Sequence, residues 1–440
     1  MKESQINLIR VTRRFFSSFN NGNYFPYKDS IFYLATYSNF IGSSILSSLS
    51  GDKRESLFHN SINIIKDILY SLNYNNYKTY IPKKSFLYDK IIVTWAFSNN
   101  FNKDGSLRDR YFNIDSKDLK KTLWFVVYLS KNNPQKIADN IIIFKPTTKK
   151  SLNPFGIIKI MFKNIFFIFK NFKYYLALVS NSNYLAEILI KEINPFLNDK
   201  IKYILMPFEG QTFQNRLIYL IKEKYAKIKT IGYIHSPPLA MPANFIHKNN
   251  SPDQIILSGK DQLYCFTKIL GWNKSCIKIL PSFRFRKSQK KLNNTIFFPL
   301  TVQSPTNILH ALKFLDENNF INLKEYKVKN HPAAFNSKKN IKTLNQIEIL
   351  ISNLKNKNRS IKDKYLIFIG NSGGIIEALE RGAKVIQICE FPLFDIYSNK
   401  IWPSVNSKKI KNNIFAYELK KRGNLIKFGN KKNNLKKIFN

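Results

Sequence analysis

The chain has 440 residues, of which 44% are hydrophobic and 22% charged, and this mixture excludes a disordered chain, a collagen and a small disulfide-knotted protein. Lys and Arg total 71 against 28 Asp and Glu, a formal net charge of +43 that would suit a polyanionic partner such as nucleic acid. Only 12 of the basic residues are Arg, and the chain is crowded with Lys, Asn, Ile, Phe and Tyr, which have AT-rich codons. Because codon bias can supply this charge, its position along the chain has to decide its meaning.

The cysteine pattern favours a reducing, cytoplasmic compartment. Cys265, Cys276 and Cys389 are too few and too scattered for a disulfide framework or a zinc site. The first residues also lack the apolar core of a signal peptide, so secretion is not expected. Residues 30–51 carry no charge, but seven of them are Ser, and a strand, a turn and a helix start are expected there in place of a membrane span.

Along the chain, short β-branched and aromatic runs alternate with longer segments of helical spacing, which is typical of an α/β architecture with parallel sheets. A first series of strands is expected at 31–37, 91–97, 123–129, 140–145, 202–208, 230–235, 253–258 and 276–280. A second series is expected at 295–300, 325–330, 346–352, 365–370 and 383–388. Between the two series the chain is polar, basic and aperiodic, as in a linker between domains.

These patterns predict two Rossmann-like lobes that face one another across a cleft. The expected division is an acceptor-side lobe over residues 1–285, a linker over 286–293 and a donor-nucleotide lobe over 294–407. Residues 408–440 form a basic tail, expected to be helical, for which packing against the first lobe is one arrangement. Ligands of such sheets bind beyond the carboxyl ends of the strands, so the residues that follow each strand are the candidates for function.

In the second lobe, a glycine-rich turn follows the strand 365–370 and opens a helix. Backbone N–H groups and a hydroxyl in such a turn can approach a phosphate, and Glu377 on the helix could accept from ribose hydroxyls. The alternative is a tight strand-to-helix connection with no ligand. The turn consists of Asn371, Ser372, Gly373 and Gly374.

A second candidate for donor binding is the end of the strand 325–330, where Lys329 precedes His331 and Pro332. An imidazole at this position can donate a hydrogen bond to a diphosphate, and the proline fixes the direction of the chain. By itself a His-Pro pair is more often a turn than a ligand site. The weight of the pair comes from its spacing to a further expected strand and then to the strand that ends in the Ser-Gly-Gly turn.

Over roughly residues 294–390 this order resembles the carboxyl-terminal lobe of GT-B glycosyltransferases, especially bacterial sialyl-, Kdo- and capsule-transferase relatives. The resemblance implies a GT-B-type fold in which His331, Ser372 and Gly373 hold the donor nucleotide's phosphate. Glu377 would then contact the ribose or the start of the helix. The sequence departs from many relatives in carrying Asn371 before Ser372, where they have two hydroxyl residues.

In the first lobe, two junctions place polar residues after strands. Glu209, Gly210 and Gln211 follow the strand 202–208, and His235 and Ser236 follow the next strand. Residues 200–285 resemble a family of surface-carbohydrate biosynthesis proteins from lipopolysaccharide or O-antigen loci.

An inverting sugar transfer needs a base for the acceptor hydroxyl and donors for the leaving phosphate. Glu209 is the first candidate for the catalytic base, because an apolar setting at a strand end would raise its pKa. The alternative is a carboxylate that caps the next helix. His235 is the second candidate, and its alternative is a structural turn before Pro237 and Pro238. No Asp-x-Asp pattern or other ligand spacing appears in the sequence, so neither a metal nor another cofactor is expected, as the GT-B resemblance also implies.

Residues 154–180 are expected to form one amphipathic helix with a cationic edge. In one interpretation the helix packs on the first lobe's sheet while the lysine heads reach solvent. In the other it docks the protein on an anionic membrane surface, at the inner face of the cytoplasmic membrane. The lysines of the edge are Lys159, Lys163, Lys170 and Lys173.

Together these features favour a cytoplasmic glycosyltransferase that moves a sugar from a nucleotide-sugar donor to a lipid-linked or surface-polysaccharide acceptor. Two alternatives stay open: a basic nucleic-acid-binding protein and a non-catalytic transferase-fold protein in surface-carbohydrate assembly. The first would require Arg-rich clusters or aromatic residues on a nucleic-acid-binding module, and neither is apparent, so no nucleic-acid partner is expected.

Overall fold

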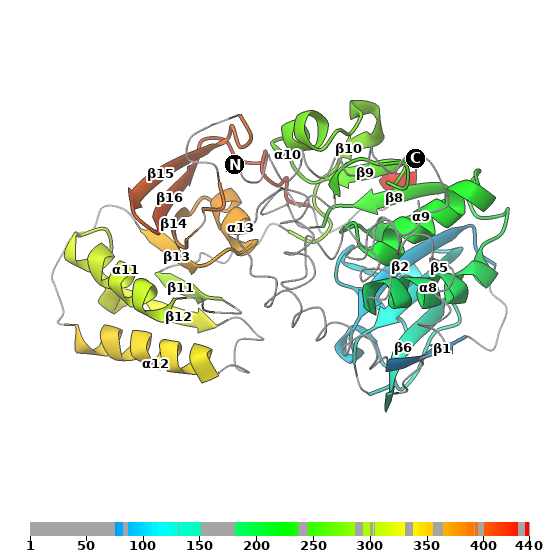
Figure 1. The fold of residues 1–440 in the computed structure, drawn as a ribbon, viewed down its shortest axis with the longest axis horizontal. Helices are drawn as coiled ribbons and strands as arrows, with labels where there is room; N and C mark the ends of the chain where they lie inside the picture. The colour runs from blue at the N-terminus through cyan, green and yellow to red at the C-terminus, as the bar shows by residue number, and fades with distance from the viewer. Residues whose placement is uncertain are drawn as a thin grey trace, which may run out of the picture.

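The computed structural model contains two β-sheets, each with helices packed against it (Figure 1). One lobe holds the strands β1 to β10, and the other holds β11 to β16. The expected α/β architecture with two Rossmann-like lobes is therefore confirmed. The structure describes residues 75–81, 87–130, 132–150, 181–235, 245–286, 294–299, 302, 304–330, 338–354, 364–390, 392–394, 400–429 and 436–439.

The eight-stranded sheet of the first lobe has the order β1-β6-β5-β2-β7-β8-β9-β10. All neighbouring strands are parallel except β1, which pairs antiparallel with β6 at one edge. Its strands are β1 (Asn75–Tyr80), β2 (Lys90–Ala96), β5 (Thr122–Tyr128), β6 (Ile141–Lys150), β7 (Tyr203–Pro207), β8 (Lys229–Tyr233), β9 (Gln254–Leu257) and β10 (Ile277–Ile279).

The strand order of this sheet fixes where a ligand would bind. From β2 the chain adds β5 and β6 on one side, and then returns to add β7, β8, β9 and β10 on the other side. The order reverses between β2 and β7, and in doubly wound sheets ligands bind beyond the carboxyl ends of the strands at such a reversal. We call the edge at which these parallel strands end the carboxyl edge of the first sheet.

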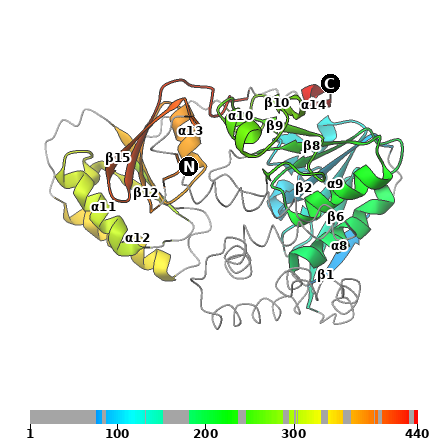
Figure 2. The same cartoon turned by 45° about the horizontal axis from the view of Figure 1, so that its top comes forward.

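Both faces of the first sheet are buried, as the apolar runs of its strands predict. All seven residues of β5 are buried. One face packs against α8 (Asn181–Ile193) and α9 (Thr212–Lys224), which lie side by side (Figure 2). The other face packs against Leu107 and Phe112 of an insertion between β2 and β5, and against Ile438 of α14 (Lys436–Phe439).

The second sheet has the order β12-β11-β13-β14-β16-β15. Its first four strands are parallel, and β15 and β16 add an antiparallel hairpin at the edge beside β14. The order reverses between β11 and β13. The strands are β11 (Thr295–Phe298), β12 (Lys327–Asn330), β13 (Tyr365–Ile369), β14 (Lys384–Ile388), β15 (Val405–Lys411) and β16 (Ile414–Leu419).

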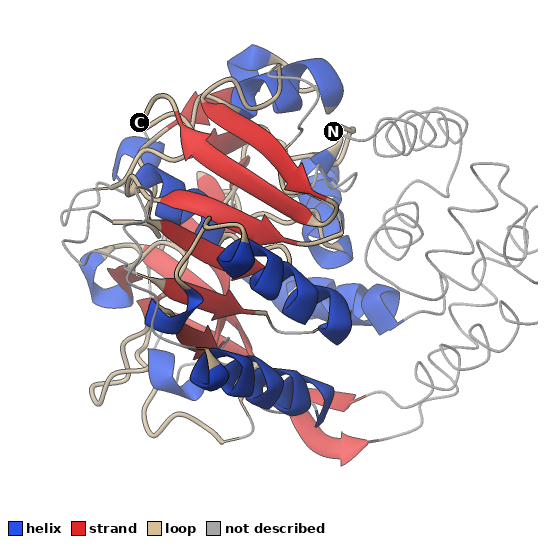
Figure 3. Cartoon of the chain, turned by 90° about the vertical axis from the view of Figure 1, so that its left-hand side faces the viewer, coloured by secondary structure: helices blue, strands red, loops and turns tan. Residues whose placement is uncertain are grey.

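Helices lie against the second sheet as well. Helices α11 (Pro305–Glu317) and α12 (Lys338–Asn353) pack with one face, and α13 (Gly374–Glu380) packs with the other. Figure 3, which views the molecule from the side of this lobe, shows the strands as layers with helices against them.

Two expectations for secondary structure are wrong. Residues 346–352, expected to be a strand, belong to α12, in which Asn340, Thr343 and Ile347 are buried at helical spacing. The run of β-branched residues suggested a strand, but its burial follows a period of 3.6 residues and not of two. The basic tail is also not helical at its start, because 405–419 forms the hairpin β15–β16, in which lysines alternate with apolar residues along an edge strand.

The C-terminal segment crosses from the second lobe to the first. After β16, backbone hydrogen bonds join Lys427 to Ser258 and Ser282, and the N–H of Gly429 donates to the carbonyl of Phe285. Figure 1 shows the C-terminus beside the strands of the first lobe.

Two buried carboxylates secure this crossing segment. Glu380 accepts from the backbone N–H groups of Gly423, Leu425 and Ile426, and Asp261 accepts from the N–H and hydroxyl of Ser404. Hydrogen bonds to charged groups contribute about 1.5 to 3 kcal/mol each, so the crossing segment is a firm connection between the lobes.

The expected strand at 31–37 and the expected amphipathic helix at 154–180 lie outside the described residues. Within the part of the chain that the structure describes, no helix is long and apolar enough to cross a membrane. The division of the chain into domains at residues 285 and 294 stays a prediction.

Candidate functional site

Glu209 and His235 meet at the carboxyl edge of the first sheet. The strands β7 and β8 are paired so that Pro207 lies beside Tyr233, and each candidate residue follows its strand by two positions. Parallel strands in this register bring the residues beyond them together. The Nε2 atom of His235 lies 3.4 Å from Oε1 of Glu209.

The turn that carries Glu209 is held from below by two buried amide side chains of α9. The Oε1 atom of Gln214 accepts from the backbone N–H groups of Glu209 and Gln211, and its Nε2 donates to the carbonyl of Pro207. The Nδ2 atom of Asn215 donates to the carbonyl of Gly210, which adopts φ +67°. A residue with a Cβ is strained in that conformation, so this glycine is needed for the turn.

The carboxylate of Glu209 is also fixed by its neighbours. The Nε2 atom of Gln211 donates to Oε2 at 2.6 Å, while Oε1 faces His235. The N-cap residue of α9 is Gln211, and so the alternative in which Glu209 caps this helix does not describe the structure. The carboxylate is directed instead toward the carboxyl edge of the sheet.

Burial sets the charge states of the pair. It raises the pKa of Glu209, while the hydrogen bond from Gln211 and the positive charge of Arg284 act in the opposite direction. Burial, assisted by Arg284, lowers the pKa of His235 to about 3. The imidazole is therefore neutral at pH 7, and its contact with Glu209 is not an ion pair there. The buried Nδ1 atom of His235 has no hydrogen-bond partner among the described residues.

An insertion between β2 and β5 covers this pair with an aromatic ring. The insertion contains the two-stranded hairpin of β3 (Arg108–Asp109) and β4 (Ile114–Asp115), and Tyr111 lies at its turn. The ring of Tyr111 meets the imidazole of His235 edge to face at a centroid distance of 4.7 Å, and that of Trp95 at 5.8 Å. Burial and the nearby Glu209 raise the pKa of Tyr111 to about 12, so its hydroxyl stays protonated.

Asp109 anchors this hairpin and was not expected from the sequence. Its side chain is only 2% exposed, and it accepts from the hydroxyl of Thr94 and from the backbone N–H groups of Tyr111 and Phe112. Burial nevertheless raises its pKa to about 6. The sequence signal was the pair Asp109 and Tyr111 within one short turn between two strands, an arrangement in which Asp commonly accepts from the backbone two residues on.

In the second lobe, the glycine-rich turn follows β13, beside the point where the strand order reverses. Asn371 is held by Gln387, whose Nε2 donates to its Oδ1 at 2.6 Å and also to the carbonyl of Gly370. The hydroxyl of Ser372 accepts from the backbone N–H of Gly374 at 3.1 Å. The turn is therefore an ordered structure.

The two glycines of this turn have different surroundings. A Cβ on Gly374 would lie 3.0 Å from the ring of Phe368, so close packing between α13 and β13 requires a glycine there. A Cβ on Gly373 would have no atom within 4 Å, and its backbone is helical with φ −61°. The space beside Gly373 is therefore open, and its lack of a side chain has no packing explanation in the described residues.

The other expected donor residues have partners of their own or lie outside the description. Glu377 is in the first turn of α13, and its Oε1 accepts from both Nε and Nη2 of Arg381. The Nζ atom of Lys329 lies 5.7 Å from the ring centroid of Phe297. The expected residues that lie outside the described ones are Ser236, His331, Lys159, Lys163, Lys170 and Lys173. Within the described ranges, no group of three or more His, Cys, Asp or Glu could hold a metal ion.

No model of a protein family matches the chain, and no curated protein matches it. Two solved structures are similar to it at 10% identity and a TM-score of 0.35. One is S. aureus MnaA with UDP, where the match covers 68% of this chain and 78% of that chain. The other is UDP-GlcNAc 2-epimerase from Neisseria meningitidis bound to UDP-GlcNAc, with 69% and 84% covered. The fold assignment rests on the strand orders of the two sheets, and neither match assigns a substrate to this chain.

Proposed function

We propose that the protein is a glycosyltransferase of the GT-B type that moves a sugar from a nucleotide-sugar donor to a lipid-linked or surface-polysaccharide acceptor. The observation that carries the proposal is the carboxylate of Glu209, held between Gln211 and His235 beyond the carboxyl end of β7. The place where the strand order of the first sheet reverses supports it, because ligands of doubly wound sheets bind there.

Glu209 is the proposed general base for the acceptor hydroxyl. A base must be ionised at working pH and yet hold a proton well, and a carboxylate with a raised pKa meets both conditions. The pKa of His235, about 3, makes its imidazole too weak a base to serve in place of Glu209. In this proposal His235 and Gln211 orient the carboxylate, since they contact its two oxygens.

The turn after β13 is the proposed site of the donor phosphate. Ser372 and Gly373 lie beside the strand reversal of the second sheet, and the open space beside Gly373 leaves room for a group to approach the backbone. His331 follows β12, the strand on the other side of β11, and is the proposed third donor to the phosphate. The proposed division into an acceptor-side lobe and a donor lobe follows from these two sites.

Donor binding tests this proposal without knowledge of the acceptor. A ligand that binds only the folded state at 100 times its dissociation constant stabilises it by about 2.7 kcal/mol. Thermal unfolding would therefore be followed with UDP-, GDP-, CMP- and dTDP-sugars in turn. We expect one class of nucleotide sugar to raise the unfolding temperature, and the absence of a shift with any of them would contradict the proposal.

A further inference from the structure

The arginines of the chain are concentrated at the carboxyl edge of the first sheet. The chain has 12 Arg in a basic total of 71, and seven of these 12 lie in the described residues. Four of the seven are on two loops that follow β2 and β10, and the Nη2 atom of Arg286 joins these loops by donating to the carbonyl of Asn113. Lysine spreads over the whole chain, so the grouping of arginines needs its own explanation. The four are Arg108, Arg110, Arg284 and Arg286.

The hairpin loop holds Arg110 beside the candidate base. The guanidinium carbon of Arg110 lies 4.9 Å from the ring centroid of Phe97, which follows the end of β2 directly. The next residue, Tyr111, contacts the imidazole of His235. Arg110 is exposed, and stacking on an aromatic ring leaves the edge of its guanidinium free to bind a planar anion.

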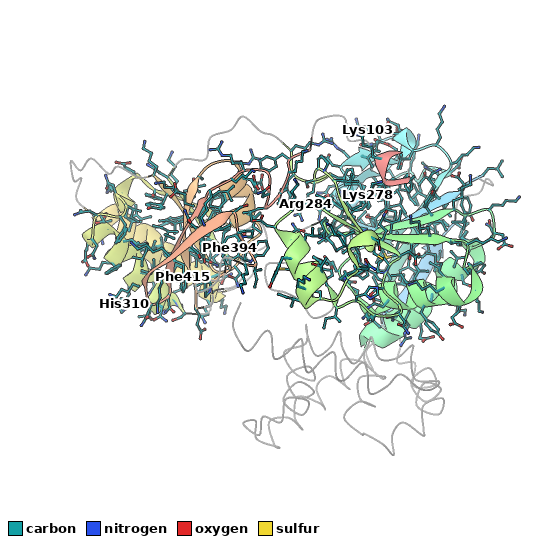
Figure 4. The ribbon with its side chains drawn as sticks, turned by 90° about the horizontal axis from the view of Figure 1, so that it is seen from above. Lys103, Lys278, Arg284, His310, Phe394 and Phe415 are labelled. Atoms are coloured by element: carbon teal, nitrogen blue, oxygen red, sulfur yellow. The ribbon has the colours of Figure 1, made fainter. Side chains whose placement is uncertain are left out.

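The loop after β10 holds Arg284 on the opposite side of the pair. The hydroxyl of Tyr233, the last residue of β8, accepts from the backbone N–H of Phe283 and lies 3.3 Å from the hydroxyl of Ser282. These contacts fix the backbone just before Arg284. Its positive charge acts on Glu209, His235 and Tyr111 together. Arg284 is exposed and lies on the side of the first lobe that faces the second lobe (Figure 4).

We propose that Arg110 and Arg284 bind a phosphate or carboxylate group of the acceptor, next to the carboxylate of Glu209. Arg is suited to both anions because its planar guanidinium donates two parallel hydrogen bonds to two oxygens. The arginines also offset the repulsion between the acidic acceptor and Glu209. That the ligand is an acceptor rests on the proposed function, whereas the anion site rests on the arginines alone.

Sugars that differ in one group test the site. Glucose 6-phosphate, glucuronate and glucose would be titrated into the full-length protein at matched ionic strength, and binding followed by NMR. The test variant is Arg110→Gln with Arg284→Gln. Its control, Lys202→Gln with Lys229→Gln, removes the same charge from exposed lysines at the opposite, amino-terminal ends of β7 and β8. A third variant, Arg110→Lys with Arg284→Lys, keeps the charge and removes the bidentate geometry.

We expect at least one acidic sugar to bind more tightly than glucose. The arginine-to-glutamine variant should weaken that binding at least about tenfold, the factor that corresponds to 1.4 kcal/mol, and the lysine control should not. The arginine-to-lysine variant should fall between them. Binding of the phosphate alone identifies a phosphorylated acceptor, binding of the carboxylate alone an acidic sugar, and both results support the site.

Equal binding of all three sugars, or equal losses in the arginine and lysine variants, would overturn the proposal, because the anion would then respond only to the bulk charge. The nucleotide-sugar screen fails or succeeds separately. If acidic sugars bind at the arginines and no nucleotide sugar binds, the transferase proposal is wrong and the anion site stands.

Discussion

The Nε2 atom of His235 lies 3.4 Å from Oε1 of Glu209, although the two residues are 26 positions apart in the chain. The contact follows from the register of β7 and β8, which end side by side. Since the imidazole is neutral at pH 7, the contact can position the carboxylate without adding a positive charge that would lower its basicity. The geometry therefore suits a carboxylate that takes a proton.

The pH dependence of the reaction should distinguish the two candidate bases. Glu209 must be ionised to act, and burial raises its pKa above 4.5, so kcat/KM should fall as the pH drops through that raised value. The same acid limb should persist in His235→Gln, because His235 does not titrate near 6.5 in the folded protein. A limb that disappears in His235→Gln while activity remains would assign the base to His235.

The two glycines after β13 should respond in opposite ways to alanine. Gly373→Ala adds a Cβ to open space on a helical backbone, so stability should stay the same or rise by about 0.4 to 1 kcal/mol, while nucleotide affinity falls if a phosphate uses that space. Gly374→Ala should destabilise the fold, because the Cβ would meet Phe368. Isothermal titration with the nucleotide sugar and chemical unfolding measure the two effects. Unchanged affinity in Gly373→Ala would exclude a phosphate from the space its Cβ would fill.

Asp109 should make the stability of the wild type depend on pH. Its pKa is about 6 in the folded state against 3.8 in the unfolded state, so the folded state holds the proton more tightly. Its contribution is therefore fully present below pH 3.8 and is lost as the pH rises through 6, by up to about 3 kcal/mol. His235 has the opposite dependence, because its pKa is lowered and its contribution is lost as the pH falls below 6.5.

A comparison with Asp109→Asn isolates the carboxyl group, since the His235 contribution is common to both proteins. Asn keeps an acceptor for the hairpin N–H groups and does not titrate. From pH 4 to pH 6.5, the free energy of unfolding of the wild type should fall relative to that of the variant. Urea unfolding at both pH values measures this difference, and a constant difference would show that Asp109 does not titrate in this range.

Glu380 should stabilise the connection between the lobes. Glu380→Ala leaves three backbone N–H groups of the crossing segment without their acceptor, and a lowered stability of roughly 3 to 5 kcal/mol is expected. The matched control is Glu418→Ala, which removes an exposed carboxylate on β16 from a pair with Lys384 and should change stability by no more than about 1 kcal/mol. Equal effects of the two substitutions in chemical unfolding would contradict this role.

Most strands could be predicted because they are apolar on both faces. Their runs of Ile, Val, Leu and Phe are typical of parallel strands covered by helices, and the residues after β7, β8 and β13 follow from those boundaries. The run 346–352 shows the limit of this reasoning, because short apolar runs in strands and in buried helices look alike. The strand inserted there had supported the spacing argument for His331 and Ser372, so the resemblance to the donor lobe of GT-B enzymes loses part of its basis.

The site was only partly predictable for a different reason. Glu209, Gln211 and His235 could be found because they follow strands directly. Gln214 and Tyr111 could not be found in this way, since their roles depend on contacts between elements that are separate in the sequence. The arginine loops were hidden by the high content of lysine, and only the fold shows that Arg110 and Arg284 lie beside the same pair of residues.

Nucleotide release is the most direct measurement of the central claim, that Glu209 is the base of a sugar transfer. Release would be followed with wild type, Glu209→Gln and the control Glu223→Gln, an exposed residue in the last turn of α9, using the nucleotide sugar found by thermal shift and an extract of envelope lipids and glycans as acceptor. The account predicts turnover by wild type and control, and a loss of about 10² to 10⁴ in Glu209→Gln with donor affinity unchanged. Wild-type turnover in Glu209→Gln would contradict it.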